Sequence, residues 1–253
     1  MKISVKNLSF GYNYRAADPG RTLFKNYSME LDTGGGVRPL IILGSSGCGK
    51  TTLLKLLGGL LKPQEGSVSI EGDVPEGKLT IDKTSFVFQE ARLLPWFTVL
   101  KNVSVPLEKE FGRGEAEKRA RHYLSLVSLE DKADSYPKEL SGGQAQRVSM
   151  ARAFAWPAPA LFMDEPYQSL DIPLRIALMD LTLSLLKDSR RLSVIVTHDP
   201  REALYLGGRI IVLGRAGKGI VFDREIISDG DKREYGSASY RVLEEELIRS
   251  LKE

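Results

Sequence analysis

The chain has 253 residues, enough to bury a substantial core as one large domain or two small ones. Its net charge of +3, from 36 Lys and Arg against 33 Asp and Glu, is too small to indicate a nucleic-acid partner. The single cysteine, Cys48, excludes an internal disulfide, and no apolar run approaches the roughly 18–20 residues of a membrane-spanning helix. We therefore expect a cytoplasmic chain that would need a partner for any role at a membrane.

The first part of the chain reads as short strands. Residues 3–12 predict a strand that ends in a turn, 13–21 a polar hairpin tip, and 27–31 a second strand. Residues 34–36 are all glycine, which predicts an irregular hairpin. The continuous apolar run at 40–43 is typical of a parallel strand covered on both faces.

Helices and strands alternate through the rest of the chain. Apolar spacing and capping signals predict helices that start after Asp171 and Asp199, each of which would act as an N-cap. The other expected helices are 53–60, 115–129, 144–155 and a final amphipathic one around 243–251, and the other expected strands are 68–70, 161–163 and 194–196.

This alternation predicts a three-layer α/β core with a mainly parallel sheet, preceded by an N-terminal antiparallel β subdomain. We expect a single domain over 1–253, with an inserted helical subdomain at 90–159 and a helical C-terminal tail at 224–253.

A glycine-rich loop follows the apolar strand at 40–43. Its glycines would let backbone N–H groups approach an anion closely, and the following helix would point the positive end of its dipole at that anion. We expect Lys50 to reach the β and γ phosphates of a nucleotide and the Thr51 hydroxyl to ligate Mg²⁺. The predicted phosphate-binding residues are Gly44, Ser45, Ser46, Gly47, Cys48, Gly49, Lys50, Thr51 and Thr52.

Acidic and imidazole side chains follow two further apolar strands. Asp164 and Glu165 come directly after 161–163, and His198 follows 194–196. Parallel strands deliver such residues to the same edge of a sheet, where ligands bind. We expect Asp164 to hold Mg²⁺ through water and Glu165 to polarise an attacking water.

A third motif, Leu140-Ser141-Gly142-Gly143-Gln144, lies between the glycine-rich loop and the acidic pair. In this order and spacing the three motifs resemble the nucleotide-binding subunit of an ABC transporter, from about 1 to 223. The resemblance implies a P-loop NTPase (RecA-like) core and hydrolysis of ATP with Mg²⁺. It also implies that Ser141, Gly142, Gly143 and Gln144 contact the ATP of a second copy of the chain, so that two chains enclose two ATP molecules.

The same resemblance implies roles for residues outside the three motifs. Gln89 would be the Q-loop glutamine that senses Mg²⁺ and the attacking water, and His198 the switch histidine that contacts the γ phosphate. Tyr12, rather than Tyr14, would stack on adenine. The D-loop at the dimer seam would be Ser169, Leu170 and Asp171.

Residues 88–96 are similar to the Q-loop region of the nitrate, sulfonate and taurine importer group. The similarity implies transmembrane permease subunits as partners, an extracytoplasmic solute-binding protein as an indirect partner, and a place on the inner face of the cell membrane. The solute would be a small organic or inorganic anion or a related nutrient. Leu94 and Trp96 would anchor the permease, although both could instead be core residues of the helical subdomain.

Two alternatives compete with an importer subunit. A soluble non-transport ABC ATPase acting on nucleic acid or ribosomes would usually show a coiled-coil insertion, zinc cysteines or two cassettes, and none occurs here. The other is a different P-loop enzyme, such as a GTPase or a small-molecule kinase; the missing Asn-Lys-x-Asp guanine signature and the presence of the third motif count against it. Tyr167 and Gln168 depart from the family pattern, and we expect neither to touch the motifs.

Overall fold

The computed structural model describes residues 2–12, 22–32, 38–71, 83–168, 170–189, 191–215, 218–226 and 235–252. The predicted hairpin tip at 13–21 with Tyr14, the glycines at 34–36, and Ser169 of the expected D-loop lie outside the described residues.

The N-terminal strands form a small antiparallel sheet in the order β2-β1-β4. Its strands are β1 (Lys2–Phe10), β2 (Phe24–Asp32) and β4 (Glu65–Glu71). Alternation along β1 buries Ile3, Val5 and Leu8, which gives this sheet one apolar face.

The second sheet runs through the centre of the molecule in the order β5-β6-β7-β3-β8-β9. Its strands are β3 (Leu40–Gly44), β5 (Thr84–Val87), β6 (Ala160–Asp164), β7 (Leu192–Val196), β8 (Gly208–Leu213) and β9 (Ile220–Ile226). All neighbours pair in parallel except β8 and β9. The predicted fold class is confirmed, and the carboxyl ends of β3, β6 and β7 meet at one edge.

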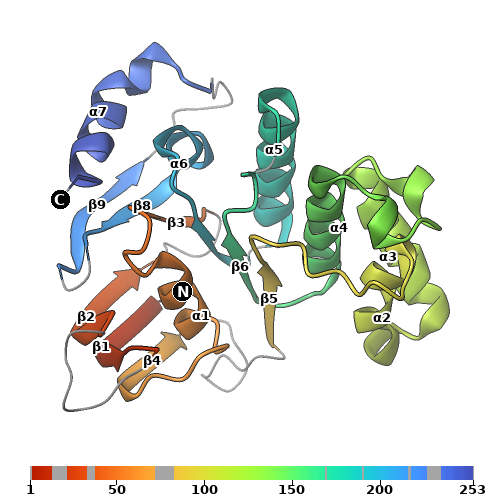
Figure 1. The fold of residues 1–253 in the computed structure, drawn as a ribbon, viewed down its shortest axis with the longest axis horizontal. Coiled ribbons are helices and arrows are strands. Elements are labelled where there is room, and N and C mark those ends of the chain that lie inside the picture. The colour runs from red at the N-terminus through yellow and green to blue at the C-terminus, as the bar shows by residue number, and fades with distance from the viewer. Residues whose placement is uncertain are drawn as a thin grey trace.

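Helices cover the central sheet and extend beyond it. They are α1 (Lys50–Leu57), α2 (Val99–Phe111), α3 (Arg113–Leu126), α4 (Gly142–Ala155), α5 (Ile172–Ser189), α6 (Pro200–Leu206) and α7 (Arg241–Ser250), with short 3-10 turns η4 (Glu130–Lys132), η5 (Pro137–Glu139) and η6 (Ala238–Tyr240). Helices α2, α3 and α4 lie together beyond β5, whereas α7 lies at the opposite side beside β9 (Figure 1).

Several predicted boundaries are wrong, among them the helix expected at 53–60, which is α1 at Lys50–Leu57. The helix expected at 115–129 begins at Arg113, directly after Gly112, whose φ of 74° separates it from α2. Helix α4 begins at Gly142 instead of Gln144, because Ser141 caps it. The tail expected from Arg224 starts inside β9, whose charged residues pair with β8 at the sheet edge.

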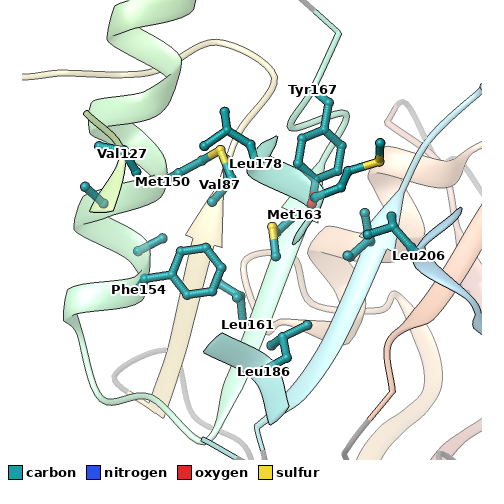
Figure 2. Packing of buried hydrophobic residues seen from close by; sticks show 14 of the residues in the cluster. Val87, Val127, Met150, Phe154, Leu161, Met163, Tyr167, Leu178, Leu186 and Leu206 are labelled. Carbon is teal, nitrogen blue, oxygen red and sulfur yellow. The ribbon is translucent and has the colours of Figure 1, made fainter. Parts of the chain in front are cut away.

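The core has two layers, one on each face of the central sheet. Alternate residues of its strands face α1 and the small sheet, as Leu40, Ile42 and Phe162 do. The intervening residues face the helices on the other side, where Leu161 and Met163 pack against Phe154 of α4 and Leu178 and Leu186 of α5 (Figure 2). Burial of both faces explains the continuous apolar runs in the sequence.

Candidate functional site

The glycine-rich loop connects β3 to α1 at the carboxyl edge of the central sheet. Gly47 and Gly49 adopt φ values of 79° and 103°, in the left-handed region that glycine tolerates. The Lys50 ammonium donates to the carbonyl oxygens of Gly44 at 2.8 Å and Ser45 at 3.1 Å. The loop therefore curves around the Lys50 ammonium group at the N-terminus of α1, and this arrangement is suited to anion binding.

Cys48, in the middle of this loop, is buried, and burial raises the pKa of its thiol. A thiol in this state is a weak nucleophile, so Cys48 has a packing role in the loop.

Thr51 and Asp164 lie side by side, although 113 positions separate them in sequence. The Thr51 hydroxyl donates to Asp164 Oδ1 at 3.0 Å. Asp164 ends β6 and is buried, and this burial raises the pKa of its carboxyl, while the bond from Thr51 lowers it. The pair presents two oxygen donors next to the glycine-rich loop, the ligand type that Mg²⁺ prefers.

Glu165 and His198 meet at the same edge. His198 Nδ1 lies 3.0 Å from Glu165 Oε2. The Glu165 backbone has a φ of 46°, unusual for a residue with a side chain, and its N–H donates to Val196 of β7 at 2.9 Å. The turn after β6 thus directs this carboxylate toward the histidine that follows β7.

A cleft of about 360 Å³ lies between the glycine-rich loop, Glu165 and His198, and neither Thr51 nor Asp164 is among its lining residues. Its lining residues are Gly44, Ser45, Ser46, Lys50, Gln89, Glu165, Gln168, His198 and Leu251. It contains the phosphate-binding loop, two glutamines, a carboxylate and an imidazole, which is a suitable set for a polyphosphate and a hydrolytic water.

Gln168 corrects one expectation from the sequence. It lines the cleft and accepts a 2.8 Å hydrogen bond from the Gln89 amide, so it does touch a motif residue. The turn of 165–168 after β6 brings it there. Its neighbour Tyr167 points the other way, is 0% exposed and donates to Thr182 at 3.0 Å. Tyr167 is a core residue (Figure 2).

Tyr12 lies at the end of the small sheet with its ring 62% exposed. Its hydroxyl is 3.2 Å from that of Thr52 in α1, and Phe10 contacts its ring edge-on. The exposed ring next to the loop is available for stacking.

The third motif starts α4, on the other side of β5 and β6 from α1 (Figure 1). Ser141 Oγ accepts from the backbone of Gln144 at 3.2 Å, and the Gln144 side chain accepts from the backbone of Ser141 at 2.9 Å. This capping box leaves the helix N-terminus exposed. None of the motif residues is among those that line the cleft described above.

Packing among the described residues does not require a glycine at position 142. A Cβ atom at this position would meet none of them within 4 Å, and the φ of Gly142 is not in the left-handed region. By contrast, a Cβ at Gly49 would lie 2.9 Å from the Phe24 ring.

Two of the three expected D-loop residues are described. Asp171 Oδ1 accepts from the backbone of Leu174 at 3.0 Å, so it is the N-cap predicted for α5. The carbonyl of Leu170 accepts from Arg175 at 3.1 Å. The contacts of Arg175 are not predictable from the sequence, because a lone arginine on a helix carries no functional signal.

The segment after Gln89 exposes one large aromatic side chain. Trp96 is 66% exposed, so it is not a core residue. Leu94 is half-buried, and its backbone N–H and C=O both bond to the Asn102 side chain. The loop that presents Trp96 is therefore held against α2.

None of the helices in the described ranges is both long and apolar enough to cross a membrane.

The comparison with protein families decides the identity of this chain. The family model described as "ABC transporter" matches residues 24–168, more than half of the sequence. The chain belongs to the ABC transporter family. Its glycine-rich loop and its acidic pair both fall within the matched region.

Named relatives of this ABC transporter chain are ATP-binding proteins. It is 40% identical to "Aliphatic sulfonates import ATP-binding protein SsuB" of Rhodopseudomonas palustris, over 100% of this chain and 84% of the relative. It is 39% identical to the protein of the same name from Burkholderia ambifaria, over 90% of this chain and 67% of the relative.

Solved structures of ABC transporter cassettes have the same fold. The dimeric, post-hydrolysis structure of the ATP-binding cassette MJ0796 bound to ADP and Pi matches with a TM-score of 0.76 and 32% identity. The match covers 90% of this chain and 100% of that cassette.

Proposed function

We propose that this chain is the ATP-hydrolysing subunit of an ABC importer, in which two copies close on ATP and drive a separate transmembrane permease. The observation that carries the hydrolytic part is the cleft in which Lys50, Glu165 and His198 converge. The names of the two sulfonate-import relatives support the importer part.

ATP would lie with its phosphates on the glycine-rich loop and its adenine against Tyr12. The loop N–H groups and Lys50 would bind the phosphates, and Lys50 would exchange its bonds to backbone carbonyls for bonds to phosphate oxygens. Thr51 and Asp164 supply the oxygen donors that fit Mg²⁺, with Gln89 as a further ligand. When bound, Mg²⁺ neutralises charge that develops on the phosphates.

Glu165 would orient and polarise the attacking water, since phosphoryl transfer needs positioning more than covalent chemistry. His198, which bonds to Glu165 here, would turn to the γ phosphate when ATP binds. The Gln89–Gln168 hydrogen bond would break as Gln89 moves toward the nucleotide.

The cradle at Ser141–Gln144 would bind the ATP of a second copy, with Leu170 and Asp171 at the seam. Exposure of this helix N-terminus and the open space around Gly142 support this assignment, since a glycine without a role in its own chain suits an external ligand. The dimeric state of the MJ0796 structure supports it as well.

A complementation experiment tests the shared site. Lys50→Ala removes the phosphate contact, and Gly142→Asp places a carboxylate where the partner's ATP would bind. An acidic residue in the first turn of a helix stabilises that helix, so Gly142→Asp should fold normally. Each variant alone should lose ATPase activity. A mixture should regain activity, because a mixed dimer has one intact shared site. If the mixture stays inactive while mixed dimers form, the shared site is refuted.

The permease would dock on the surface around Trp96, whose exposure next to the anchored Leu94 supports this role. We propose an aliphatic sulfonate or a similar small anion as the solute, an extracytoplasmic solute-binding protein as an indirect partner, and a location at the inner face of the cell membrane. Copurification of the tagged chain with a permease from membranes of its native cell tests this assignment. Recovery with ribosomes or nucleic acid would contradict it.

A further inference from the structure

The C-terminal segment 235–252 packs against α6, close to the proposed catalytic residues. Leu247 of α7 is fully buried, and Glu244 forms a 2.8 Å ion pair with Arg201 of α6. Leu251, just after α7, lines the cleft that holds Lys50 and His198. The end of the chain is therefore part of the wall of the nucleotide cleft.

Tyr235, where this segment begins, bonds to the residue that follows His198. Its hydroxyl donates to Asp199 Oδ2 at 3.1 Å. The other carboxylate oxygen of Asp199 caps α6 by accepting from the backbone of Arg201 at 2.8 Å. The two oxygens of Asp199 thus have different tasks, one in the helix cap and one in a contact with the C-terminal segment.

Arg175 extends this contact to the expected D-loop. It is only 18% exposed, forms ion pairs with Asp199 at 3.4 Å and Glu202 at 3.3 Å, and donates to the Leu170 carbonyl at 3.1 Å. It also contacts the Tyr235 hydroxyl at 3.4 Å. One largely covered guanidinium therefore joins three segments that are distant in sequence.

His198 lies between two anchored residues. The Thr197 N–H donates to Ile42 of β3 at 3.1 Å, and the Thr197 hydroxyl donates to Glu202. On the other side, the Asp199 N–H donates to the Thr197 hydroxyl at 3.1 Å. His198 therefore directly precedes a residue whose side chain is held by Tyr235 and Arg175.

We infer that Tyr235 is a positioning residue for ATP hydrolysis. Through Asp199 and Arg175, it holds the segment that carries His198 in a fixed position relative to the D-loop. This inference rests on the proposed role of His198 in hydrolysis. It gives the C-terminal segment a function in the ATPase site, and it explains why a tyrosine hydroxyl, an arginine and an aspartate converge at the start of α6.

Tyr235→Phe tests the inference with little disturbance, since it keeps the ring contact with Tyr205 and removes only the hydroxyl. In the full-length chain, kcat for ATP should fall about threefold to tenfold, the range that corresponds to one hydrogen bond. The KM for ATP should stay within about twofold, because no ATP-binding group is changed. Tyr240→Phe, in the same segment, is the matched control and should leave kcat unchanged.

Asp199→Asn is the second variant. It keeps an oxygen to cap α6 but weakens the bonds from Tyr235 and Arg175, so kcat should fall in the same way. Combined with His198→Ala, Tyr235→Phe should cause almost no further loss of kcat, because both changes affect one unit.

Three results would overturn the inference: an unchanged kcat in Tyr235→Phe, a lower melting temperature as its sole effect, or an equal further loss of kcat in the His198→Ala background. Equal hydrolysis by the wild-type chain and the His198→Ala variant would instead refute the proposed role of His198, and the inference with it. The two failures are thus distinguishable.

Discussion

Glu165 and His198 are in contact across the carboxyl edge of the central sheet, with 3.0 Å between Oε2 and Nδ1. The contact depends on the left-handed backbone at Glu165, which turns its side chain away from Asp164 and toward the end of β7. Two adjacent acids thereby receive different tasks: Asp164 faces Thr51, and Glu165 faces the histidine.

Replacing Glu165 by Gln should leave ATP binding intact and reduce turnover by about 10²- to 10⁴-fold, the contribution of a general base. The ATP-loaded variant should run as a dimer in size-exclusion chromatography, since the closed state no longer opens by hydrolysis. Glu130→Gln, an exposed change on η4, serves as control. A strictly monomeric, ATP-loaded variant would contradict the two-chain site.

Replacing Asp164 by Asn should raise the melting temperature of the nucleotide-free protein at neutral pH. Burial raises the pKa of this carboxyl, so its ionised form costs stability in the folded state, and that cost is present above the raised pKa. The gain should shrink as pH falls through the raised pKa and vanish below the ordinary value of 3.8. Asn still accepts the bond from Thr51.

Thermal unfolding across this pH range checks the prediction. In a chain of this size, each kcal/mol gained in the free energy of unfolding should raise the melting temperature by about 2–4 °C. The same variant should lose Mg²⁺-dependent ATPase activity. If the Asp164→Asn variant melts at a lower temperature than the wild-type chain at neutral pH, the carboxylate stabilises the folded state, contrary to the expectation.

Replacing Trp96 by Ala should leave the ATPase activity of the isolated chain near normal and weaken capture of the permease. An exposed aromatic anchor contributes about 2 kcal/mol or more to binding, which is roughly 30-fold in affinity. Pull-down of membrane subunits measures the effect. Val242→Ala, at a position that is 80% exposed on the distant α7, is the control. Undiminished capture would exclude Trp96 from the docking surface.

Replacing Tyr167 by Phe should destabilise the chain by about 1 kcal/mol and leave kcat unchanged. The variant removes a buried hydrogen bond to Thr182, which keeps its own bond to the Leu178 carbonyl. Chemical denaturation and steady-state kinetics measure the two effects. A marked loss of kcat at unchanged stability would place Tyr167 in the site rather than in the core.

Local patterns were sufficient to predict the central sheet and the positions of Lys50, Asp164 and His198. Asp164 ends a buried apolar strand, His198 lies two residues after another, and Lys50 follows the short glycine-rich loop after a third. Parallel strands bring such positions to one edge of the sheet. The true start of α4 was also readable, because Ser141 and Gln144 have the spacing of a capping box.

Contacts between distant segments could not be predicted in this way. Gln168 reaches Gln89 across 79 positions, and Tyr235 reaches Asp199 across 36. Neither residue belongs to a periodic pattern, and each gains its role only from the turn or packing that carries it to the edge of the sheet. The charged sequence of β9 likewise resembles a solvent-exposed tail, since its pairing with β8 has no local signal.

The open space around Gly142 means that two kinds of mutational scan should disagree at this position. A scan that selects for folding of the isolated chain should accept many side chains there, because none would clash. A scan that selects for growth on the transported nutrient should accept glycine almost alone. Positions at which the two scans disagree would mark the surface that this chain shares with its neighbours in the assembled transporter.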